Sequence, residues 1–288
     1  MPKKLIIFCA VVTALSAAAC RQASADEMVR PDKSKIRVTV PPGQAATGFI
    51  AVENPSSEPK SVRAYLEDWA YLAPYDGSKE FKPAGSLKNS AADWITFTPA
   101  ELTLAPNSRE RINYTVKVPS GAAEGRYAVL FLESMASSGA GEGVGVNLAI
   151  RVAVLFFVEP EGMIKRALSV DGLSVTRSPK GMLDISLPVT NTGNIDLTVG
   201  GSFDIMDAKG MVAARGVFND IYTLPGNSAR LTASWSLPIE PGEYSLVMTL
   251  DLGKALEEAN AGRGPVIVKE AKLTLGPGGL IKEVGELK

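Results

Sequence analysis

Carboxylates are the side chains of this sequence that best suit catalysis, and the chemistry they would support is glycoside hydrolysis. Asp68, Glu133 and Asp251 are examples, but nothing in their spacing singles out a pair. The 288 residues contain no histidine, which excludes Ser-His-Asp and Cys-His catalysis, imidazole bases and histidine-bound zinc. We therefore predict no catalytic residue, and we interpret these carboxylates as solvated groups at strand ends.

The amino-terminal segment contains both cysteines, Cys9 and Cys20, and is typical of a bacterial export signal. Two lysines precede an apolar stretch, and small residues follow it. Cleavage after the Ala-Ser-Ala that precedes Asp26 would release a soluble chain. Alternatively, the "AAAC" that ends at Cys20 resembles a lipoprotein box, in which this cysteine would be acylated and anchor the protein. Beyond the leader there is no cysteine for a disulfide, a thiolate nucleophile or a metal site.

The charge balance excludes two further classes of partner. Charged residues make up 21% of the chain, the net charge is −1, and there is no long block of one sign. Nucleic-acid binding requires a basic face, and docking on anionic lipid requires a basic cluster. The sequence also has no glycine-rich phosphate loop with its lysine. We expect no nucleic acid, no metal and no cofactor.

The segment from Val144 to Pro160, "VGVNLAIRVAVLFFVEP", is the most apolar part of the chain after the leader. A helix needs about 20 consecutive apolar residues to cross a bilayer. This run is shorter, and Arg151 interrupts it. We interpret the segment as a β-strand, and the open question is what it covers.

The rest of the chain predicts an all-β fold. Short stretches with alternating apolar residues are separated by clusters of Pro, Gly, Asn and Asp, which is typical of β-sandwiches. We expect two immunoglobulin-like β-sandwich domains in tandem after a cleaved signal peptide, with the signal at 1–25 and the domains at 26–162 and 163–288. The expected strands are 35–40, 47–53, 61–69, 94–98, 109–118, 126–134 and 144–160, then 168–176, 182–190, 197–206, 211–218, 229–237, 243–251 and 266–275.

An internal repeat supports this division. "LTLAPNSRERINYTVKVPSGAAEGRYAVLFLE" and "YTLPGNSARLTASWSLPIEPGEYSLVMTLD" share a Leu, a turn, an arginine-bearing strand, a proline and a Gly-x-Tyr. Upstream, "VENPSSEP" and "VTNTGNID" each end a strand in an asparagine turn. Tyr127 and Tyr244 occupy the position of the tyrosine corner of immunoglobulin-like domains.

The first half resembles a known family. "VENPSSEPKSVRAYLEDW", then "DGSKEF", then "WITFTPAELTLAPNSRERINYTVKVP" is similar to the amino-terminal domain of the PapD-like periplasmic pilus chaperones, over roughly 32–160. The resemblance implies two immunoglobulin-like domains set at an angle. It also implies a non-enzymatic chaperone or assembly factor that binds exported pilus or surface subunits in the periplasm, donates a β-strand to them, and delivers them to an outer-membrane usher.

In this family the last strand of the first domain carries the donated residues. Here Val144, Val146, Leu148 and Ile150 alternate on one face of the expected strand. Main-chain pairing with a partner strand would give affinity, and these side chains would give register. The alternative is that the strand closes its own core. From Ile150 to Val158 both faces are apolar, and there we expect a strand covered on both sides.

The resemblance also implies a carboxylate anchor. Family members hold the terminal carboxylate of the subunit between two basic residues, one on the first strand and one on the last. Arg151 matches the position on the last strand, and Lys35 matches the one on the first strand, where Arg37 and Lys33 are equally plausible. A guanidinium and an ammonium that converge in a cleft suit a carboxylate. The alternative for each is a surface charge or a local ion pair.

A second function remains open from the sequence, an envelope-associated adhesion or binding module. Its candidate residues are Trp69, Tyr71 and Tyr75, whose rings could stack on sugar, although packing inside the domain is the alternative for them. Either function places the chain outside the cytoplasm. We expect it in the periplasm, or lipid-anchored in the cell envelope if Cys20 is acylated.

Overall fold

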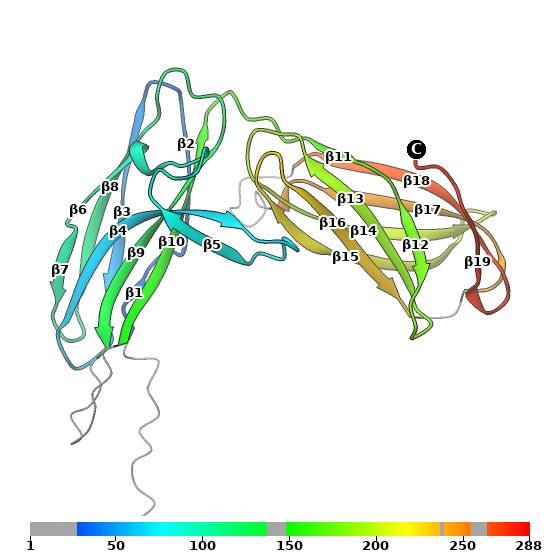
Figure 1. The fold of residues 1–288 in the computed structure, drawn as a ribbon, viewed down its shortest axis with the longest axis horizontal. Coiled ribbons are helices and arrows are strands. Elements are labelled where there is room, and N and C mark those ends of the chain that lie inside the picture. Colours follow the sequence, from blue (N-terminus) through cyan, green and yellow to red (C-terminus); the bar gives the residue numbers. More distant parts are fainter. Residues whose placement is uncertain (1–27, 137–147, 237–238, 255–263) are drawn as a thin grey trace, which may run out of the picture.

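The protein consists of two elongated β-sandwiches joined end to end at an angle (Figure 1). The structure, a computed structural model, describes residues 28–136, 148–236, 239–254 and 264–288. Within these residues regular structure is nearly all β-strand, with short 3₁₀ turns at η2 (Ala92–Trp94) and η3 (Pro277–Gly279). The expected all-β tandem of immunoglobulin-like sandwiches is confirmed.

The first sandwich pairs a four-stranded sheet, in the order β1-β3-β8-β6, with a six-stranded sheet, in the order β2-β10-β9-β4-β5. In the second sheet β7 also pairs with β4. The strands are β1 (Arg30–Pro31), β2 (Lys35–Val40), β3 (Ala45–Glu53), β4 (Lys60–Tyr71), β5 (Lys79–Pro83), β6 (Ile95–Thr98), β7 (Glu101–Leu104), β8 (Arg109–Lys117), β9 (Arg126–Ala136) and β10 (Leu148–Pro160).

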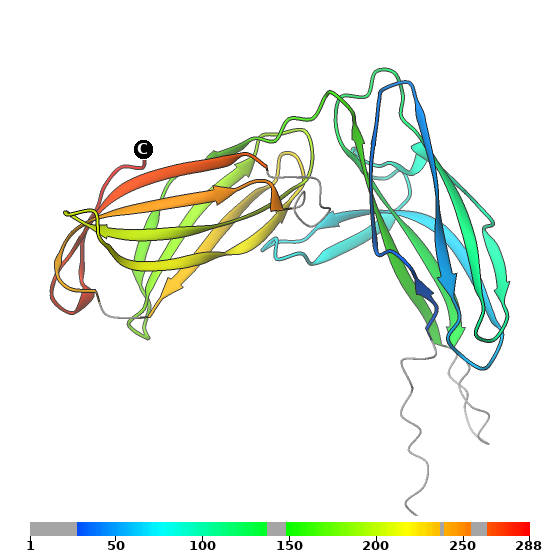
Figure 2. The same cartoon turned by 180° about the vertical axis from the view of Figure 1, so that it is seen from behind.

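The second sandwich has the same plan, seen from behind in Figure 2. One sheet has the order β11-β13-β12, with β16 also paired to β13, and the other has the order β15-β14-β17-β18-β19. The strands are β11 (Leu168–Val170), β12 (Ser174–Arg177), β13 (Leu183–Asn191), β14 (Leu197–Asp207), β15 (Val212–Thr223), β16 (Ser228–Trp235), β17 (Gly242–Asp251), β18 (Val266–Leu275) and β19 (Ile281–Val284).

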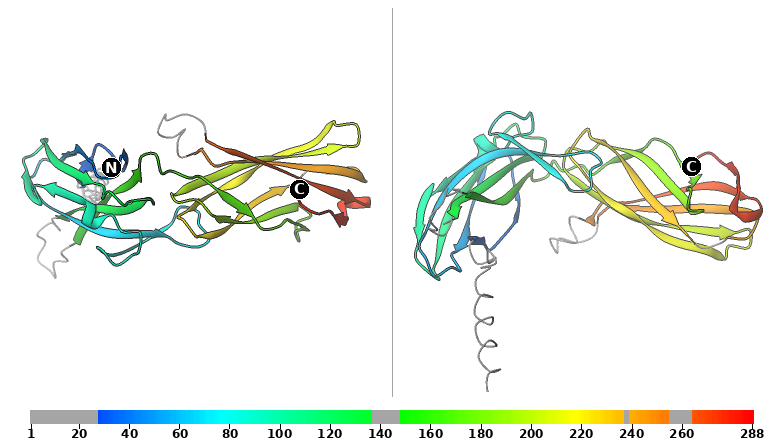
Figure 3. Two further views of the ribbon diagram at one scale, coloured as in Figure 1. Left: turned by 90° about the horizontal axis from the view of Figure 1, so that it is seen from above. Right: turned by 60° about the horizontal axis from the view of Figure 1, so that its bottom comes forward.

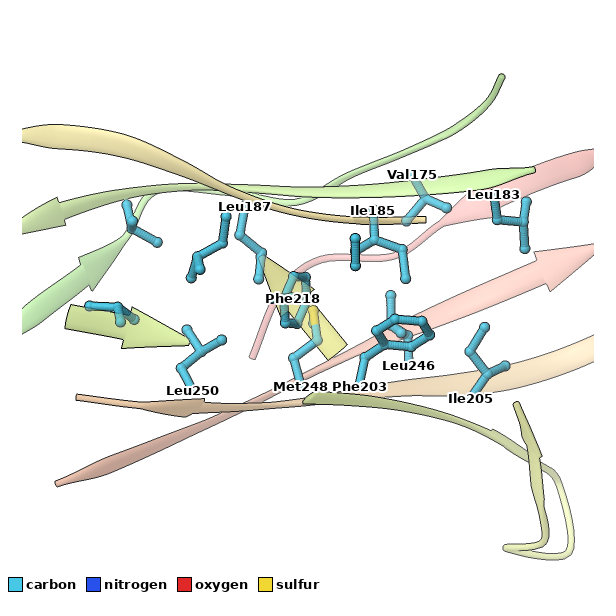
Figure 4. Close-up of a cluster of buried hydrophobic side chains, with 14 of the residues drawn as sticks. Val175, Leu183, Ile185, Leu187, Phe203, Ile205, Phe218, Leu246, Met248 and Leu250 are labelled. Atoms are coloured by element: carbon cyan, nitrogen blue, oxygen red, sulfur yellow. The ribbon is translucent and has the colours of Figure 1, made fainter. Parts of the chain in front are cut away.

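Alternation of side chains builds the core of the second sandwich. Along β13 every second residue is buried, as strand geometry requires when one face meets another sheet. Ile185 and Leu187 of β13 face Phe203 and Met248 of the opposite sheet (Figure 4). The first sandwich has its own core, and no buried residue belongs to both. The sheets therefore divide between 30–160 and 168–284, and the boundary that we predict after Gly162 lies between these ranges.

The internal repeat corresponds to one buried asparagine in each sandwich. The Asn54 side chain donates to the carbonyl of Glu58 at 2.8 Å and accepts from the Ser56 amide at 3.1 Å. In the second sandwich the Asn191 side chain donates to the Ile195 carbonyl at 3.0 Å and accepts from the amide two residues further on. Each asparagine thus supplies the hydrogen bonds that a buried turn cannot obtain from water.

The two tyrosines of the internal repeat, Tyr127 and Tyr244, differ in their hydrogen bonding. The Tyr244 hydroxyl donates to the Glu240 carbonyl at 2.7 Å, which is the bond expected of a tyrosine corner. Tyr127 does not make this bond. Among the described residues its hydroxyl, buried beside the Asp196 backbone of the second domain, forms no well-aligned hydrogen bond, and its ring packs on Trp69 near the junction of the domains. The predicted corner is therefore confirmed in the second domain and wrong in the first.

Most strand predictions are confirmed, with three kinds of exception. β1, β5, β7 and β19 were not expected, and the stretch 168–176 is two strands because Gly172, at φ 150°, interrupts it. The export signal at 1–25, including Cys20, lies outside the described residues, so its processing stays a prediction.

A cluster of charges joins the two sandwiches. The Arg37 guanidinium on β2 forms ion pairs with Glu159, at the end of β10, and with Asp196 of the second domain. Burial alone would lower the pKa of Arg37, but hydrogen bonds and charge attraction from Asp196 and Glu159 outweigh it, and the net pKa is raised. Burial raises the pKa of Glu159, opposed by the charge of Arg37.

Apolar packing and backbone bonds complete the junction. Trp69, Tyr127 and Phe157 of the first domain form one buried cluster with Leu224 of the second. The Gly125 amide donates to the Asn194 carbonyl at 2.8 Å. The junction thus combines a buried aromatic cluster with charges and hydrogen bonds, at the place where the two sandwiches meet in both views of Figure 3.

Candidate functional site

The first half of β10 has one paired edge and one open edge. On one side β10 pairs with β9 from Leu148 to Val158. On the other side β2 pairs with it only from Leu155 to Pro160. Among the described residues no strand pairs with the second edge between Leu148 and Val154. An open strand edge presents unpaired N–H and C=O groups that another chain can use.

The open edge exists because the chain before β2 changes sheets. β1 pairs with β3 in the four-stranded sheet, whereas β2 pairs with β10 in the six-stranded sheet. At the crossing, Asp32 exchanges two hydrogen bonds with Ala51 of β3, each 2.9 Å, and these hold the chain in the ladder of β3. Pairing with β10 begins only where the Leu155 amide donates to the Ser34 carbonyl at 2.9 Å.

The backbone alternation identifies the groups that face the open edge. Because the amide of Leu155 points toward β2, the amides and carbonyls of Arg151 and Ala153 point to the same side, as do those of Ala149. These three residues therefore offer their main chain to an added strand. Their neighbours Ile150 and Val152 direct their main chain toward β9.

The side chains of β10 divide between two environments. Val154, Phe156 and Val158 lie in the core of the first sandwich, and Leu155 and Phe157 lie in the aromatic cluster of the junction. The strand is therefore covered on both faces from Val154 to Val158, as expected. The prediction that this coverage begins at Ile150 is wrong, because Ile150, Val152 and Ala153 are only half-buried and Arg151 is exposed. The reason is that β2 covers the strand edge only from Leu155 onward.

The four predicted donor residues are only partly described. Val144 and Val146 lie outside the described residues, and for Leu148 only the backbone is described, paired with Ala136. Ile150 pairs with Ser134 and is half-buried on the face that carries Val152 and Val154. The donor role of all four residues stays a prediction.

Arg151 lies on the outer face of the six-stranded sheet, over the ring of Phe131 at 4.5 Å. Its Nη1 donates to Glu67 Oε1 at 3.2 Å and to the Tyr65 hydroxyl at 3.3 Å. The hydrogen bond with Tyr65 raises the pKa of Arg151, burial opposes this slightly, and Glu67 adds to it by charge attraction. The side chain is still 42% exposed. Arg151 therefore has the local ion pair considered above and keeps donors in contact with solvent.

Lys35 is the first residue of β2 and is exposed. In the parallel ladder it lies opposite Leu155, and not opposite Arg151. Paired residues share a face, so Lys35 and Arg151 both lie on the outer face, four residues apart along β10, or about 13 Å. The two predicted anchors are thus on one face but not side by side, and their joint role stays a prediction.

The carboxylates do not form a catalytic pair. Asp68 is buried and accepts from the Leu87 amide and the Ser90 hydroxyl. Glu133 accepts from Tyr65, and Asp251 accepts from the Gly253 amide. Asp68 thus serves a buried turn, which differs from the expected solvated strand end. In the described part of the chain no three His, Cys, Asp or Glu residues gather in a metal site.

The three aromatic residues of the adhesion hypothesis all make contacts within the protein. Trp69 is fully buried, and its indole nitrogen donates to the Ala128 carbonyl at 3.0 Å. Tyr71 packs edge-on against Trp69, with ring centroids 5.0 Å apart, and Tyr75 bonds the second domain through its carbonyl. A buried indole cannot stack on a sugar, so packing is the correct interpretation for Trp69.

Two features of this region were not found from the sequence. Tyr65 and Glu67 contact Arg151, and the signal that could have identified them is the alternation of β4, which places both on the outer face. The open edge itself had no signal in the sequence, because it depends on where β2 begins to pair.

Among the helices of the described residues, none is long and apolar enough to cross a membrane.

No protein-family model and no curated protein matches this sequence. Solved structures do resemble it. The class 5 fimbriae chaperone CfaA is 15% identical, with a TM-score of 0.48 over 84% of this chain and 98% of that chain. The YadV chaperone is 14% identical, with a TM-score of 0.43 over 85% and 99%. The SafB chaperone of Salmonella enterica, solved with the SafA pilin, is 14% identical, with a TM-score of 0.40 over 84% and 95%. At these identities the likeness is one of fold alone.

Proposed function

We propose that this protein is a non-enzymatic periplasmic chaperone or assembly factor that binds exported pilus or surface subunits through the open edge of β10. The observation that carries the proposal is the edge from Leu148 to Val154, which has β9 on one side and, within the described part of the chain, no strand on the other. A subunit with an incomplete sheet can pair its own edge with Ala149, Arg151 and Ala153. This is strand addition between two chains.

The alternating side chains supply the rest of the affinity. Val144, Val146, Leu148 and Ile150 are the residues that we propose to enter the groove of the subunit. Full burial of each aliphatic side chain contributes roughly 1.5–3 kcal/mol before the cost of ordering the strand is subtracted. Arg151, on the opposite face of the strand, stays outside this groove.

The start of β2 limits how the partner strand can lie. Because β2 occupies the edge of β10 from Leu155 onward, an added strand must end beside Lys35. A strand parallel to β10 would bring its carboxyl end to this point. An antiparallel one would bring its amino end, which the charge of Lys35 disfavours. We propose that Lys35, with Arg151 on the same face, receives the terminal carboxylate of a parallel strand.

The cellular setting is part of the proposal. The export signal at 1–25 would deliver the chain to the periplasm, and an outer-membrane usher would receive the subunit there. Acylation of Cys20 would instead leave the protein anchored in the envelope. Mass spectrometry of the mature protein distinguishes an amino terminus at Asp26 from a lipid-modified Cys20.

A pair of substitutions on β10 tests the proposal. Ile150→Asp puts a charge on the face that we assign to the partner, and Ala149→Asp puts the same charge on the exposed face. We expect Ile150→Asp to abolish co-purification of a β-rich subunit from the periplasm of the native host, and Ala149→Asp to retain it. In the complex, hydrogen exchange at the amides of Ala149, Arg151 and Ala153 should slow. Equal exchange with and without the partner would exclude strand addition at this edge.

A further inference from the structure

We propose that a hollow on the outer face of the second domain binds an arginine side chain of a partner protein. The hollow lies on the sheet β15-β14-β17-β18-β19, which is in front in Figure 2. Its volume of about 650 Å³ is within the range of pockets that hold small ligands. It is separate from the open edge of β10, and the inference does not depend on strand addition there.

A β-bulge forms the hollow. In the ladder of β14 with β15 the register shifts after Val199, so that two residues of β15, Asn219 and Asp220, lie opposite the single residue Gly200. A bulge of this kind changes the direction in which side chains point. A Cβ on Gly200 would overlap the side chains of Asp220 and Lys254, so the absence of a side chain here leaves the room that these two groups occupy.

The carboxylates at the hollow exceed its cations. The one lysine, Lys254, is already paired, because its Nζ lies 2.5 Å from Asp220 Oδ1. Asp251 of β17 lies opposite Gly200 and accepts from the Gly253 amide at 2.6 Å. Among the described residues, Asp251 forms no ion pair with a lysine or arginine. The lining therefore carries one negative charge in excess.

Neutral polar groups and apolar side chains complete the lining. Ser202 and Thr249 lie opposite each other on β14 and β17 and supply two hydroxyls, and Asn219 supplies an amide. Val217 of β15 and Val266 of β18 lie on the two sides of these polar groups, with 74% and 55% of their surface exposed. The hollow thus has a polar floor between two exposed valines.

A guanidinium fits this lining better than other groups do. It carries five N–H donors in one plane, so it can bind a carboxylate together with nearby hydroxyl and amide oxygens. The aliphatic stem of an arginine can pack against valine while the charged end reaches the floor. An anion would be repelled by the two carboxylates and would find Lys254 already paired.

The two valines indicate that the occupant is a protein segment and not a single side chain. They lie on β15 and β18, with the strands that carry the carboxylates between them. An extended segment could cover both valines if apolar residues flank its arginine, and burial of exposed apolar surface would add to the affinity. The geometry therefore points to an arginine between apolar neighbours.

Two short peptides test this assignment. Each is blocked at both ends and has two valines, with either arginine or citrulline between them, because citrulline has nearly the same shape without the charge. Binding to the full mature protein is followed by NMR. We expect the arginine peptide to bind at least about tenfold more tightly than the citrulline peptide. The largest shifts should occur at the amides of Ser202, Thr249 and Asp251.

Three variants locate the recognition. Asp251→Asn keeps an acceptor for the Gly253 amide but removes the charge, and it should weaken the arginine peptide about tenfold without affecting the citrulline peptide. Gly200→Ala should weaken both peptides, and the backbone tolerates it because Gly200 has no positive φ. The control is Glu270→Gln, at an exposed position of β18 on the same face as Val266, which should change neither affinity. Thermal unfolding confirms that each variant is folded.

Several results would contradict the inference. Failure of the arginine peptide to bind, equal affinity of the two peptides, or equal effects of Asp251→Asn and Glu270→Gln would show that the hollow does not recognise a guanidinium. If N-acetylarginine amide binds as tightly as the arginine peptide, the flanking valines make no contact and the assignment to a protein segment is wrong. Shifts confined to β10 would place the peptide at the open edge instead of the hollow.

Discussion

The Arg37 guanidinium donates two parallel hydrogen bonds, of 2.9 and 2.8 Å, to the two carboxylate oxygens of Asp196 across the junction of the domains. Planar bidentate pairing of this kind fixes orientation as well as distance. Glu159 binds the same guanidinium from within the first domain. One arginine therefore ties together β2, the end of β10 and the second sandwich.

Removal of this arginine should strongly destabilise the protein. Arg37→Ala leaves Glu159 and Asp196 buried without their main cation, which costs about 3–5 kcal/mol in the free energy of unfolding. Urea unfolding monitored by tryptophan fluorescence measures the loss. Arg63→Ala, at an exposed position of β4, is the control and should change stability by less than about 0.5 kcal/mol. Equal effects of the two substitutions would show that the buried cluster contributes little.

The two tyrosines of the internal repeat should respond differently to the loss of their hydroxyl. Tyr244→Phe removes the bond to the Glu240 carbonyl and should cost about 1 kcal/mol. Tyr127→Phe removes a buried hydroxyl that forms no well-aligned hydrogen bond among the described residues, so stability should change by less than it does for Tyr244→Phe. Chemical denaturation of the two variants checks this difference, and a larger loss for Tyr127→Phe would contradict it.

The asparagine turn of the first domain should be as important as a core residue. Asn54→Ala removes the bonds to the Glu58 carbonyl and the Ser56 amide at a fully buried position. We expect a loss of about 2–3 kcal/mol in the free energy of unfolding. Asn113→Ala, at an exposed position of β8, is the matched control and should be nearly neutral.

Local patterns allowed the sequence to predict the fold. Alternation identified β2, β13 and β18 nearly to the residue, because each has one buried face. The asparagine turns were visible because their bonds join residues close in the chain. The Arg37 cluster was not predictable, since its partners lie 122 and 159 residues away.

The candidate site, too, was only partly predictable from the sequence. The alternating side chains before Arg151 were visible in the sequence, but the length of the open edge was not, since it depends on the crossing at Asp32 and on the first pairing of β2. Pairings between distant segments are what sequence patterns alone do not encode.

Under the proposed function, the place where β2 joins β10 would set the position of the added strand. A strand whose carboxyl end stops beside Lys35 would have its register set by its last residue, whatever its sequence. Strands of different composition could then bind in the same register, provided that apolar and polar residues alternate in the same phase at their carboxyl ends. Recognition of the strand end rather than of a particular sequence would let one protein bind several related subunits.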